Sequence, residues 1–248
     1  MSETLYGRNA VYEALRARRR EPHRLLVAKG VRETGIIEQI LQLAKEIGVP
    51  VERVDRGRLN DFGPFSHQGV ALEASPYAYT PLEELFGVAA SGDDAPFLLL
   101  LDLLKDPHNV GSLLRTAEAV GVHGVVIQER RAVDITPTVG HTSAGAVEHV
   151  RVAQVTNLVR AIEWLKDQRV WVAGLDAVPG AQPYDDADLT GSLAVVVGSE
   201  GRGMRRLVGE RCDFLVQLPM RGRVTSLNAS VAGSVILYEA LRQRRGSG

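Results

Sequence analysis

The sequence has a single cysteine and no long apolar run, and each of these absences excludes a class of protein. Cys212 has no second cysteine with which to form an internal disulfide or a multi-cysteine zinc site. No apolar run approaches the roughly 20 residues that a membrane-spanning helix needs. Residues 1–4 lack the basic-then-apolar pattern of a signal peptide. We therefore expect a cytoplasmic protein without a membrane segment.

Several common catalytic motifs are missing as well. The glycines of residues 198–203 follow the order G-x-x-G-x-G, which is not the Rossmann fingerprint, and no Gly-Lys-Ser/Thr ends the loop as in a Walker motif. Ser143 lacks the G-x-S-x-G setting of a hydrolase nucleophile. His141 and His149 have no third close ligand, so we expect no metal site.

The basic residues are almost all arginine. The formal net charge is only −1, yet the sequence has 25 arginines against 4 lysines, in clusters at 16–24, 202–206, 221–223 and 242–245. Arginine grips phosphates with a bidentate fork and stacks on bases, so these clusters suit RNA. The alternative is that a high-GC genome uses arginine codons on solvated faces. Charge therefore supports an RNA partner without establishing one.

The N-terminal third alternates helix and strand patterns. Apolar residues recur at helical spacing in 9–20 and 36–47, where Thr34 is a candidate cap, and strand patterns occupy 25–28, 49–54 and 68–74. Proline, glycine and acidic residues then dominate 76–95. We predict a small α/β domain over 1–75, a linker over 76–95 and a second domain over 96–248.

The second domain contains continuous apolar runs at 97–101, 124–127, 170–173, 193–197 and 214–218. Strands that are buried on both faces have this pattern, and helical segments between them predict a parallel sheet with helices on both sides. Ligands bind such sheets at the carboxyl ends of the strands. Residues 198–201 follow one of these strands directly, which makes this loop a candidate binding site.

Three motifs in this domain carry polar side chains. In 102–118, Asn109 lies near the start of an amphipathic helix that Gly121 ends, and Arg115 lies two turns later, off the apolar stripe. In 198–204, the glycines let the backbone approach a ligand, and Glu200 can accept hydrogen bonds from a hydroxyl or amine. The simpler interpretations are helix capping for Asn109 and solvation for Arg115.

The third motif, 218–231, leads into a predicted helix that runs to about residue 245. Ser226 is placed at its N-cap and Asn228 in its first turn, where capping is again the simpler interpretation.

Taken together, these segments resemble a known family. The patterns N-x-G-x-x-x-R after Asp-Pro-His, V-x-G-S-E-G-x-G-M, and L-P-M-x-G-x-x-x-S-L-N-x-S-V resemble the three motifs of the SpoU/TrmH family of SPOUT methyltransferases, in order and at matching spacing. Residues 6–11 and 67–70 resemble segments of the N-terminal RNA-binding domain in 23S ribosomal RNA guanosine 2′-O-methyltransferases of the RlmB type. The resemblance covers nearly the whole chain.

The resemblance implies an α/β fold with a deep C-terminal trefoil knot, S-adenosylmethionine bound among the knot loops, and a homodimer whose subunits share each active site. The residues that it implies for cofactor binding are Gly198, Gly201, Leu218, Met220 and Leu227. Those that it implies for the polar, catalytic site are Asn109, Arg115, Glu200, Ser226 and Asn228.

The reaction that the resemblance implies is methyl transfer to the ribose 2′-hydroxyl of a guanosine in 23S rRNA. A guanidinium stays protonated in proteins, so we expect Arg115 to hold the adjacent phosphate and stabilise alkoxide charge rather than act as a base. The alternatives are a tRNA guanosine 2′-O-methyltransferase, which the folded N-terminal extension argues against, and a resistance-type rRNA methyltransferase with the same two-domain layout. A catalytically silent RNA-binding assembly factor is a further alternative, which the intact polar residues argue against.

Overall fold

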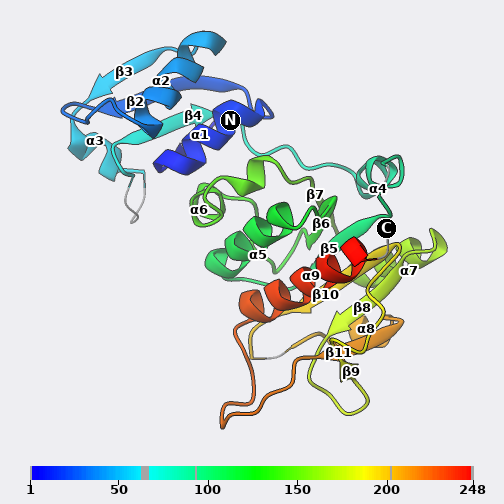
Figure 1. Cartoon of the computed structure of the whole chain (residues 1–248). Coiled ribbons are helices and arrows are strands. Elements are labelled where there is room, and N and C mark those ends of the chain that lie inside the picture. Colours follow the sequence, from blue (N-terminus) through cyan, green and yellow to red (C-terminus); the bar gives the residue numbers. More distant parts are fainter. Residues whose placement is uncertain (1, 63–66, 93, 202, 247–248) are drawn as a thin grey trace. The chain divides into compact units, whose positions relative to one another are not determined.

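The computed structural model describes residues 2–62, 67–92, 94–201 and 203–246 (Figure 1). The chain divides into two compact units. Unit 1 consists of Met1–Ala78 and Ile135–His149, and unit 2 consists of Tyr79–Asp134 and Val150–Gly248. Unit 1 therefore includes an internal segment, Ile135–His149, whose two ends both continue into unit 2. Sequence patterns did not indicate this segment, and the predicted boundaries at 75 and 96 stay a prediction.

Unit 1 contains a four-stranded sheet. Its strands are, in spatial order, β1 (Glu3–Tyr6), β4 (Val70–Ala74), β2 (Pro22–Ala28) and β3 (Val51–Val54). β1 and β2 pair antiparallel with β4, and β2 pairs parallel with β3. Alternate residues of β2 enter two different cores, because Leu25 and Val27 pack on one side of the sheet and Leu26 and Ala28 on the other.

The helices of unit 1 cover both faces of this sheet. α1 (Arg8–Ala17) and α2 (Ile36–Ile47) pack on one face, and α3 (Arg56–Asn60) contributes Leu59 to the core of the other. The N-cap of α2 is Gly35, so the prediction that Thr34 caps this helix was wrong. The glycine adopts φ 61° and ψ −126°, a conformation that a side chain disfavours.

A buried ion pair fixes the internal segment in unit 1. The segment forms α6 (Pro137–Thr142) and the short 3₁₀ helix η1 (Ala146–Glu148). The Nε of Arg20 donates to the carboxylate of Glu148 at 2.9 Å, and both side chains are 2% exposed. The Nη1 of Arg20 also donates to Glu3 on β1 at 2.8 Å. Buried charges need partners of this kind, so the ion pair links η1 to the first strand.

Unit 2 contains a seven-stranded sheet in which every strand pair is parallel. The spatial order is β7 (Val152–Val155), β6 (Gly124–Gln128), β5 (Phe97–Asp102), β10 (Leu193–Gly198), β8 (Trp171–Leu175), β11 (Phe214–Gln217) and β9 (Gln182–Pro183). β5, β6 and β10 are buried along their whole length. Their continuous apolar runs are what a central strand with two covered faces requires.

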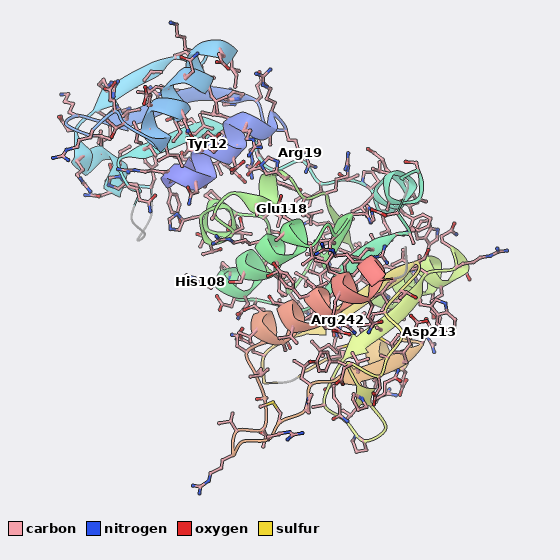
Figure 2. The ribbon with its side chains drawn as sticks, viewed as in Figure 1. Tyr12, Arg19, His108, Glu118, Asp213 and Arg242 are labelled. Atoms are coloured by element: carbon pink, nitrogen blue, oxygen red, sulfur yellow. The ribbon has the colours of Figure 1, made fainter. Side chains whose placement is uncertain are left out.

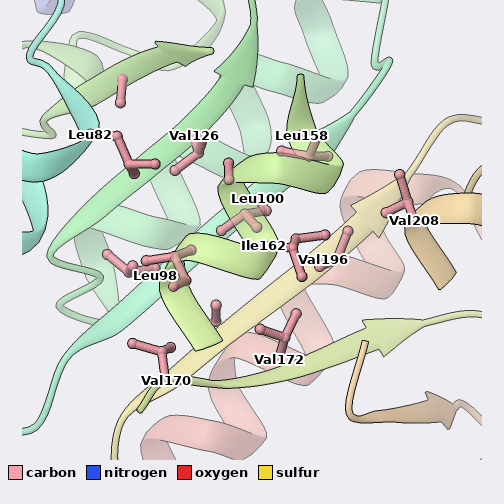
Figure 3. Packing of buried hydrophobic residues seen from close by; sticks show 14 of the residues in the cluster. Leu82, Leu98, Leu100, Val126, Leu158, Ile162, Val170, Val172, Val196 and Val208 are labelled. Carbon is pink, nitrogen blue, oxygen red and sulfur yellow. The ribbon is translucent and has the colours of Figure 1, made fainter. Parts of the chain in front are cut away.

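One face of this sheet packs against α4 (Leu82–Ala90), α7 (Leu158–Asp167) and α8 (Arg206–Gly209). Figure 3 shows alternate strand residues, such as Leu98, Leu100 and Val196, in contact with the apolar side of α7. α4 lies within the segment predicted as a linker, and its Leu82 and Leu85 belong to this core.

The other face of the sheet packs against α5 (Pro107–Ala119) and α9 (Ala229–Gly246), which lie side by side (Figure 1). The hydroxyls of Thr116 on α5 and Ser234 on α9 are 2.8 Å apart. Gly233 allows this close packing, because a Cβ at this position would overlap Leu113 and contact Val197. The two helices therefore form one layer, and each begins at the same edge of the sheet.

All five strands predicted for the second domain are present, and the parallel sheet with helices on both faces is confirmed. The patterns did not predict β7, β9 or α4. No helix among the described residues is long and apolar enough to cross a membrane. The trefoil knot stays a prediction.

Candidate functional site

The candidate site lies at the carboxyl ends of the neighbouring strands β5 and β10, where Gly198 is in register with Asp102. Asp102 is 1% exposed. Its carboxylate accepts hydrogen bonds from the backbone N–H and the Nε of Arg205, both at 2.8 Å. The end of β5 thus anchors the loop that follows β10, and Asp102 obtains the partners that a buried charge needs.

The loop after β10 is a tight turn. Ser199 and Gly203 exchange two backbone hydrogen bonds, of 3.1 and 2.9 Å, and Gly201 and Gly203 have φ values of 72° and 64°. A Cβ on Gly198 would overlap the backbone of Gly203 and Met204. The glycines are therefore required by the turn itself, which leaves Glu200 exposed at its tip.

Three side chains from the three motifs meet at this turn. The Nδ2 of Asn109, in the first turn of α5, donates to Asp106 Oδ2 at 2.9 Å and also to Glu200 Oε1. The Nδ2 of Asn228 donates to Asn109 Oδ1 at 2.9 Å and to Glu200 Oε1 at 2.7 Å. Both amide N–H bonds of each asparagine are thus used, and Asn109 is 5% exposed. We call the side chains of Asp106, Asn109, Glu200 and Asn228 the amide network.

Two capping predictions change as a result. The N-cap of α5 is Asp106, whose Oδ1 accepts from the backbone N–H of His108 at 3.0 Å, so Asn109 is free for the amide network. Figure 2 labels His108 at the start of α5. The N-cap role at α9 belongs to Asn228, whose Oδ1 accepts from the N–H of Ser230 at 2.9 Å. The prediction that Ser226 caps this helix was wrong, since α9 begins at Ala229.

A cavity of about 580 Å³ opens beside the amide network. Its lining includes all five residues that were predicted to bind the cofactor, together with three of the predicted polar residues: Gly198, Gly201, Leu218, Met220, Leu227, Glu200, Ser226 and Asn228. Its wall combines apolar side chains and glycine backbone with a comparable share of polar side chains. Small-molecule sites commonly have this size.

Arg115 is separate from this cavity. It lies on α5 with its side chain exposed, and no ion pair or hydrogen bond joins it to another described residue. Asn109 does not line the cavity either, but it lines a neighbouring cavity of about 390 Å³, together with Lys105 and the shared Glu200. Arg202, from the predicted arginine cluster at 202–206, lies outside the described residues.

Comparisons with known proteins agree with this geometry. Residues 96–238 match the SpoU rRNA Methylase family, and residues 4–80 match the RNA 2′-O ribose methyltransferase substrate binding family. The chain belongs to the SpoU rRNA methylase family. The putative TrmH family tRNA/rRNA methyltransferase YacO of Bacillus subtilis (strain 168) is 46% identical over 242 residues, which is 98% of this chain and 96% of that protein.

Two solved structures of SpoU proteins are similar to the structure of this chain. The SpoU methyltransferase AviRb from Streptomyces viridochromogenes, in complex with the cofactor AdoMet, has a TM-score of 0.82 at 24% identity and covers 100% of this chain and 92% of its own. The TrmH/SpoU tRNA modifying enzyme of A. aeolicus has a TM-score of 0.56 at 26% identity and covers 67% of this chain and 84% of its own.

Two residues of this SpoU site were missed by sequence reasoning. Asp106 was seen only as part of the Asp-Pro-His sequence, although aspartate before proline at a helix start is a capping signal. Asp176 lies directly after β8 and lines the 580 Å³ cavity, a position that the rule on carboxyl ends of strands would have found. By contrast, burial raises the pKa of the Cys212 thiol to about 12, so this thiol is not a nucleophile at neutral pH.

Proposed function

We propose that this protein transfers a methyl group from S-adenosylmethionine to a ribose 2′-hydroxyl of RNA, and that its target is a guanosine in 23S rRNA. The observation that carries the proposal is the amide network, which joins the three SpoU motifs around one turn beside a cavity of nucleoside size. The family matches over residues 4–80 and 96–238 support the same activity.

The residues of the 580 Å³ cavity beside the amide network suit this cofactor. Leu218, Met220 and Leu227 offer apolar walls, and the carboxylate of Asp176 can accept hydrogen bonds from hydroxyl or amino groups. The bare backbone at Gly198 and Gly201 permits close approach of a ligand. When bound, S-adenosylmethionine supplies an electrophilic methyl group on a positively charged sulfur. The structural neighbour AviRb, crystallised with AdoMet, supports this assignment.

The polar residues divide the remaining work. The amide network fixes Glu200 and Asn228 in the wall of the 580 Å³ cavity and Asn109 in the wall of the neighbouring cavity, where the ribose would lie. Fixed groups of this kind supply orientation, which lowers the barrier for an aligned displacement. Arg115 holds the adjacent phosphate and stabilises the negative charge that develops on the 2′-oxygen, while the proton leaves to phosphate or water.

We propose that the active unit is a homodimer, because Arg115 does not reach the cavity of its own chain. On α9, Val231, Val235 and Tyr238 are 49%, 37% and 53% exposed, and they line an open groove with Ser112 of α5. Arg115 lies one helical turn from Ser112. A second copy that covers this groove would therefore come close to Arg115.

The choice of rRNA over tRNA rests on unit 1. A segment of the chain, residues 4–80, matches a substrate-binding family, whereas the tRNA modifying enzyme of A. aeolicus covers only 67% of this chain. An enzyme that carries an added RNA-binding domain is suited to a large RNA target.

The first test is methyl transfer itself. The protein is incubated with labelled S-adenosylmethionine and separate 23S, 16S and tRNA substrates, and the 2′-O-methyl group is mapped by reverse-transcription stops at low nucleotide concentration. We expect one guanosine in 23S rRNA. Arg115→Lys should lose most activity, because lysine lacks the bidentate fork, while Arg160→Lys on the exposed side of α7 serves as the matched control. Full activity of Arg115→Lys would contradict the bidentate role.

A mixing experiment tests whether Arg115 acts across the dimer. Arg115→Ala and Gly198→Ala chains are each expected to be inactive alone. If Arg115 serves the partner's cavity, randomly mixed dimers regain about a quarter of the wild-type rate, because half of the dimers contain one complete site out of two. If Arg115 serves its own cavity, no mixture regains activity.

A further inference from the structure

Unit 1 has a cavity of about 600 Å³ whose charged lining residues are all basic. Arg8, Lys29, Arg32 and Arg56 line it, together with the amides of Asn9 and Gln68, and no carboxylate lies among the described lining residues. The four cations come from the start of α1, the connection after β2 and the start of α3. Four cations from three parts of the chain thus surround one hollow.

Three of these cations lack a partner of opposite charge. Arg8, Arg32 and Arg56 form no ion pair within 4 Å with any described residue of the chain, and only Lys29 is paired, with Asp55 at 3.0 Å. Three other arginines of unit 1 differ in this respect, because Arg24, Arg53 and Arg58 each contact a glutamate, at 2.8, 2.6 and 2.5 Å. Among the described residues, the cavity thus has three arginines whose charge no ion pair balances.

The cavity also has fixed hydrogen-bond donors. The Nε of Arg8 donates to the carbonyl of Gln68 at 3.1 Å, which directs its guanidinium without using Nη1 or Nη2. The Oε1 of Gln68 accepts from the backbone N–H of Arg8 at 2.9 Å, so its amide Nε2 remains as a donor. An arginine held by its Nε keeps a two-pronged edge for an anion such as a phosphate.

We propose that this cavity binds the phosphodiester backbone of the RNA substrate through Arg8, Arg32 and Arg56. The inference rests on the proposed function, because that function makes RNA the polyanion that this protein must hold. Unpaired arginines suit phosphate, and the cavity has room for a nucleotide that leaves the stack. The site would hold the RNA by its backbone and leave the choice of the methylated nucleotide to unit 2.

The salt dependence of RNA binding tests the inference. Binding of the full-length protein to a radiolabelled 23S rRNA transcript is measured by filter retention over a series of NaCl concentrations. Each phosphate contact contributes about 0.7 to the slope of log K against log salt for unpaired RNA. The Arg8→Gln, Arg32→Gln, Arg56→Gln triple variant should therefore lose about 2 from the magnitude of the slope.

The matched control is the Arg24→Gln, Arg53→Gln, Arg58→Gln triple variant, which removes the same charge from the same unit. We expect its slope to stay within experimental error of wild type, because its arginines already have carboxylate partners. Equal slopes for the two triple variants would overturn the inference. If the first variant does not fold, Arg32→Gln and Arg56→Gln singly, both at exposed positions, should each reduce the slope by about 0.7.

Methyl transfer to the same transcript separates this inference from the proposed function. If the wild-type protein binds RNA with the expected difference between variants but transfers no methyl group, the proposed function fails and the phosphate site stands. If the protein methylates RNA and both variants bind like wild type, the proposed function stands and the phosphate site is refuted.

Discussion

Replacing Asn228 by aspartate would test the amide network with a nearly isosteric change. The Nδ2 of Asn228 donates to Asn109 Oδ1 at 2.9 Å and to Glu200 Oε1 at 2.7 Å. Aspartate keeps an oxygen that caps α9 through the N–H of Ser230, but it turns the donor into a second carboxylate oxygen that faces Glu200. The substitution therefore removes the network and leaves the helix cap in place.

The expected loss of stability follows from these contacts. Two hydrogen bonds are lost, at about 1 kcal/mol each. Two carboxylates at contact distance repel by about 1 kcal/mol when water surrounds them, and both Asn228 and Glu200 are exposed. We expect Asn228→Asp to lower the free energy of unfolding of unit 2 by about 3 kcal/mol at pH 7.5.

Urea unfolding followed by tryptophan fluorescence measures this loss, because both tryptophans, Trp164 and Trp171, lie in unit 2. Asn228→Ser is the control, since serine also caps helices but carries no charge. It should cost about 2 kcal/mol, because it loses the two hydrogen bonds without adding the repulsion. If Asn228→Asp unfolds within about 0.5 kcal/mol of wild type at pH 7.5, the reasoning is refuted, because surface changes without partners have effects of this size.

Three further predictions concern other parts of unit 2. Gly198→Ala should abolish S-adenosylmethionine binding in calorimetry, because the new Cβ would overlap the backbone of Gly203 and displace the turn. The protein should stay folded. Unchanged affinity would show that the turn does not hold the cofactor. Arg205→Ala should lower the free energy of unfolding by about 2 kcal/mol, because among the described residues it leaves the buried Asp102 with only the backbone N–H of residue 205 as a donor. As a control, Arg206→Ala removes an exposed i,i+4 ion pair and should change the free energy of unfolding by less than about 0.5 kcal/mol. Burial and Arg244 lower the pKa of His123, whose Nδ1 accepts from the N–H of Phe97 at 2.9 Å. The unfolded chain then binds the proton more readily than the folded chain, so the free energy of unfolding should fall as the pH drops below about 6.5. His123→Asn keeps a hydrogen-bond acceptor but does not titrate, so it should reduce this fall. Urea unfolding at pH 7.5 and 5.5 measures the difference.

The sequence indicated much of the sheet of unit 2, because a central parallel strand needs an apolar side chain on both faces. β5, β6 and β10 follow that rule along their whole length. β9 has only two residues and α4 follows a proline-rich stretch, so neither has a period long enough to recognise. Local patterns also say nothing of the internal segment of unit 1, because the Arg20–Glu148 ion pair joins residues 128 positions apart.

The candidate site was predicted in the same uneven way. Loops after parallel strands lie at one edge, so the position of Glu200 follows from the pattern of β10. The helix caps were harder, because asparagine and serine both cap well and only the fold decides which residue stands at the end of α9. Asn228 was predicted as a site residue because its motif resembles the third motif of the family. In the structure it caps α9 and also donates a hydrogen bond to Asn109. The catalytic roles of these residues stay predictions.

The spacing of Asn109 and Arg115 is the reason why we propose that two chains take part in the reaction. Six residues of α-helix advance by about 9 Å and turn through about 240°, so these two side chains leave α5 in different directions. Asn109 is held at the turn after β10 by Glu200 and Asn228 of its own chain. Arg115 emerges on the exposed side of α5, near the groove that Tyr238 lines on α9. In the proposed dimer, α5 contributes to its own site with its first turn and to a neighbour's site two turns later, and the reaction would then depend on the dimer.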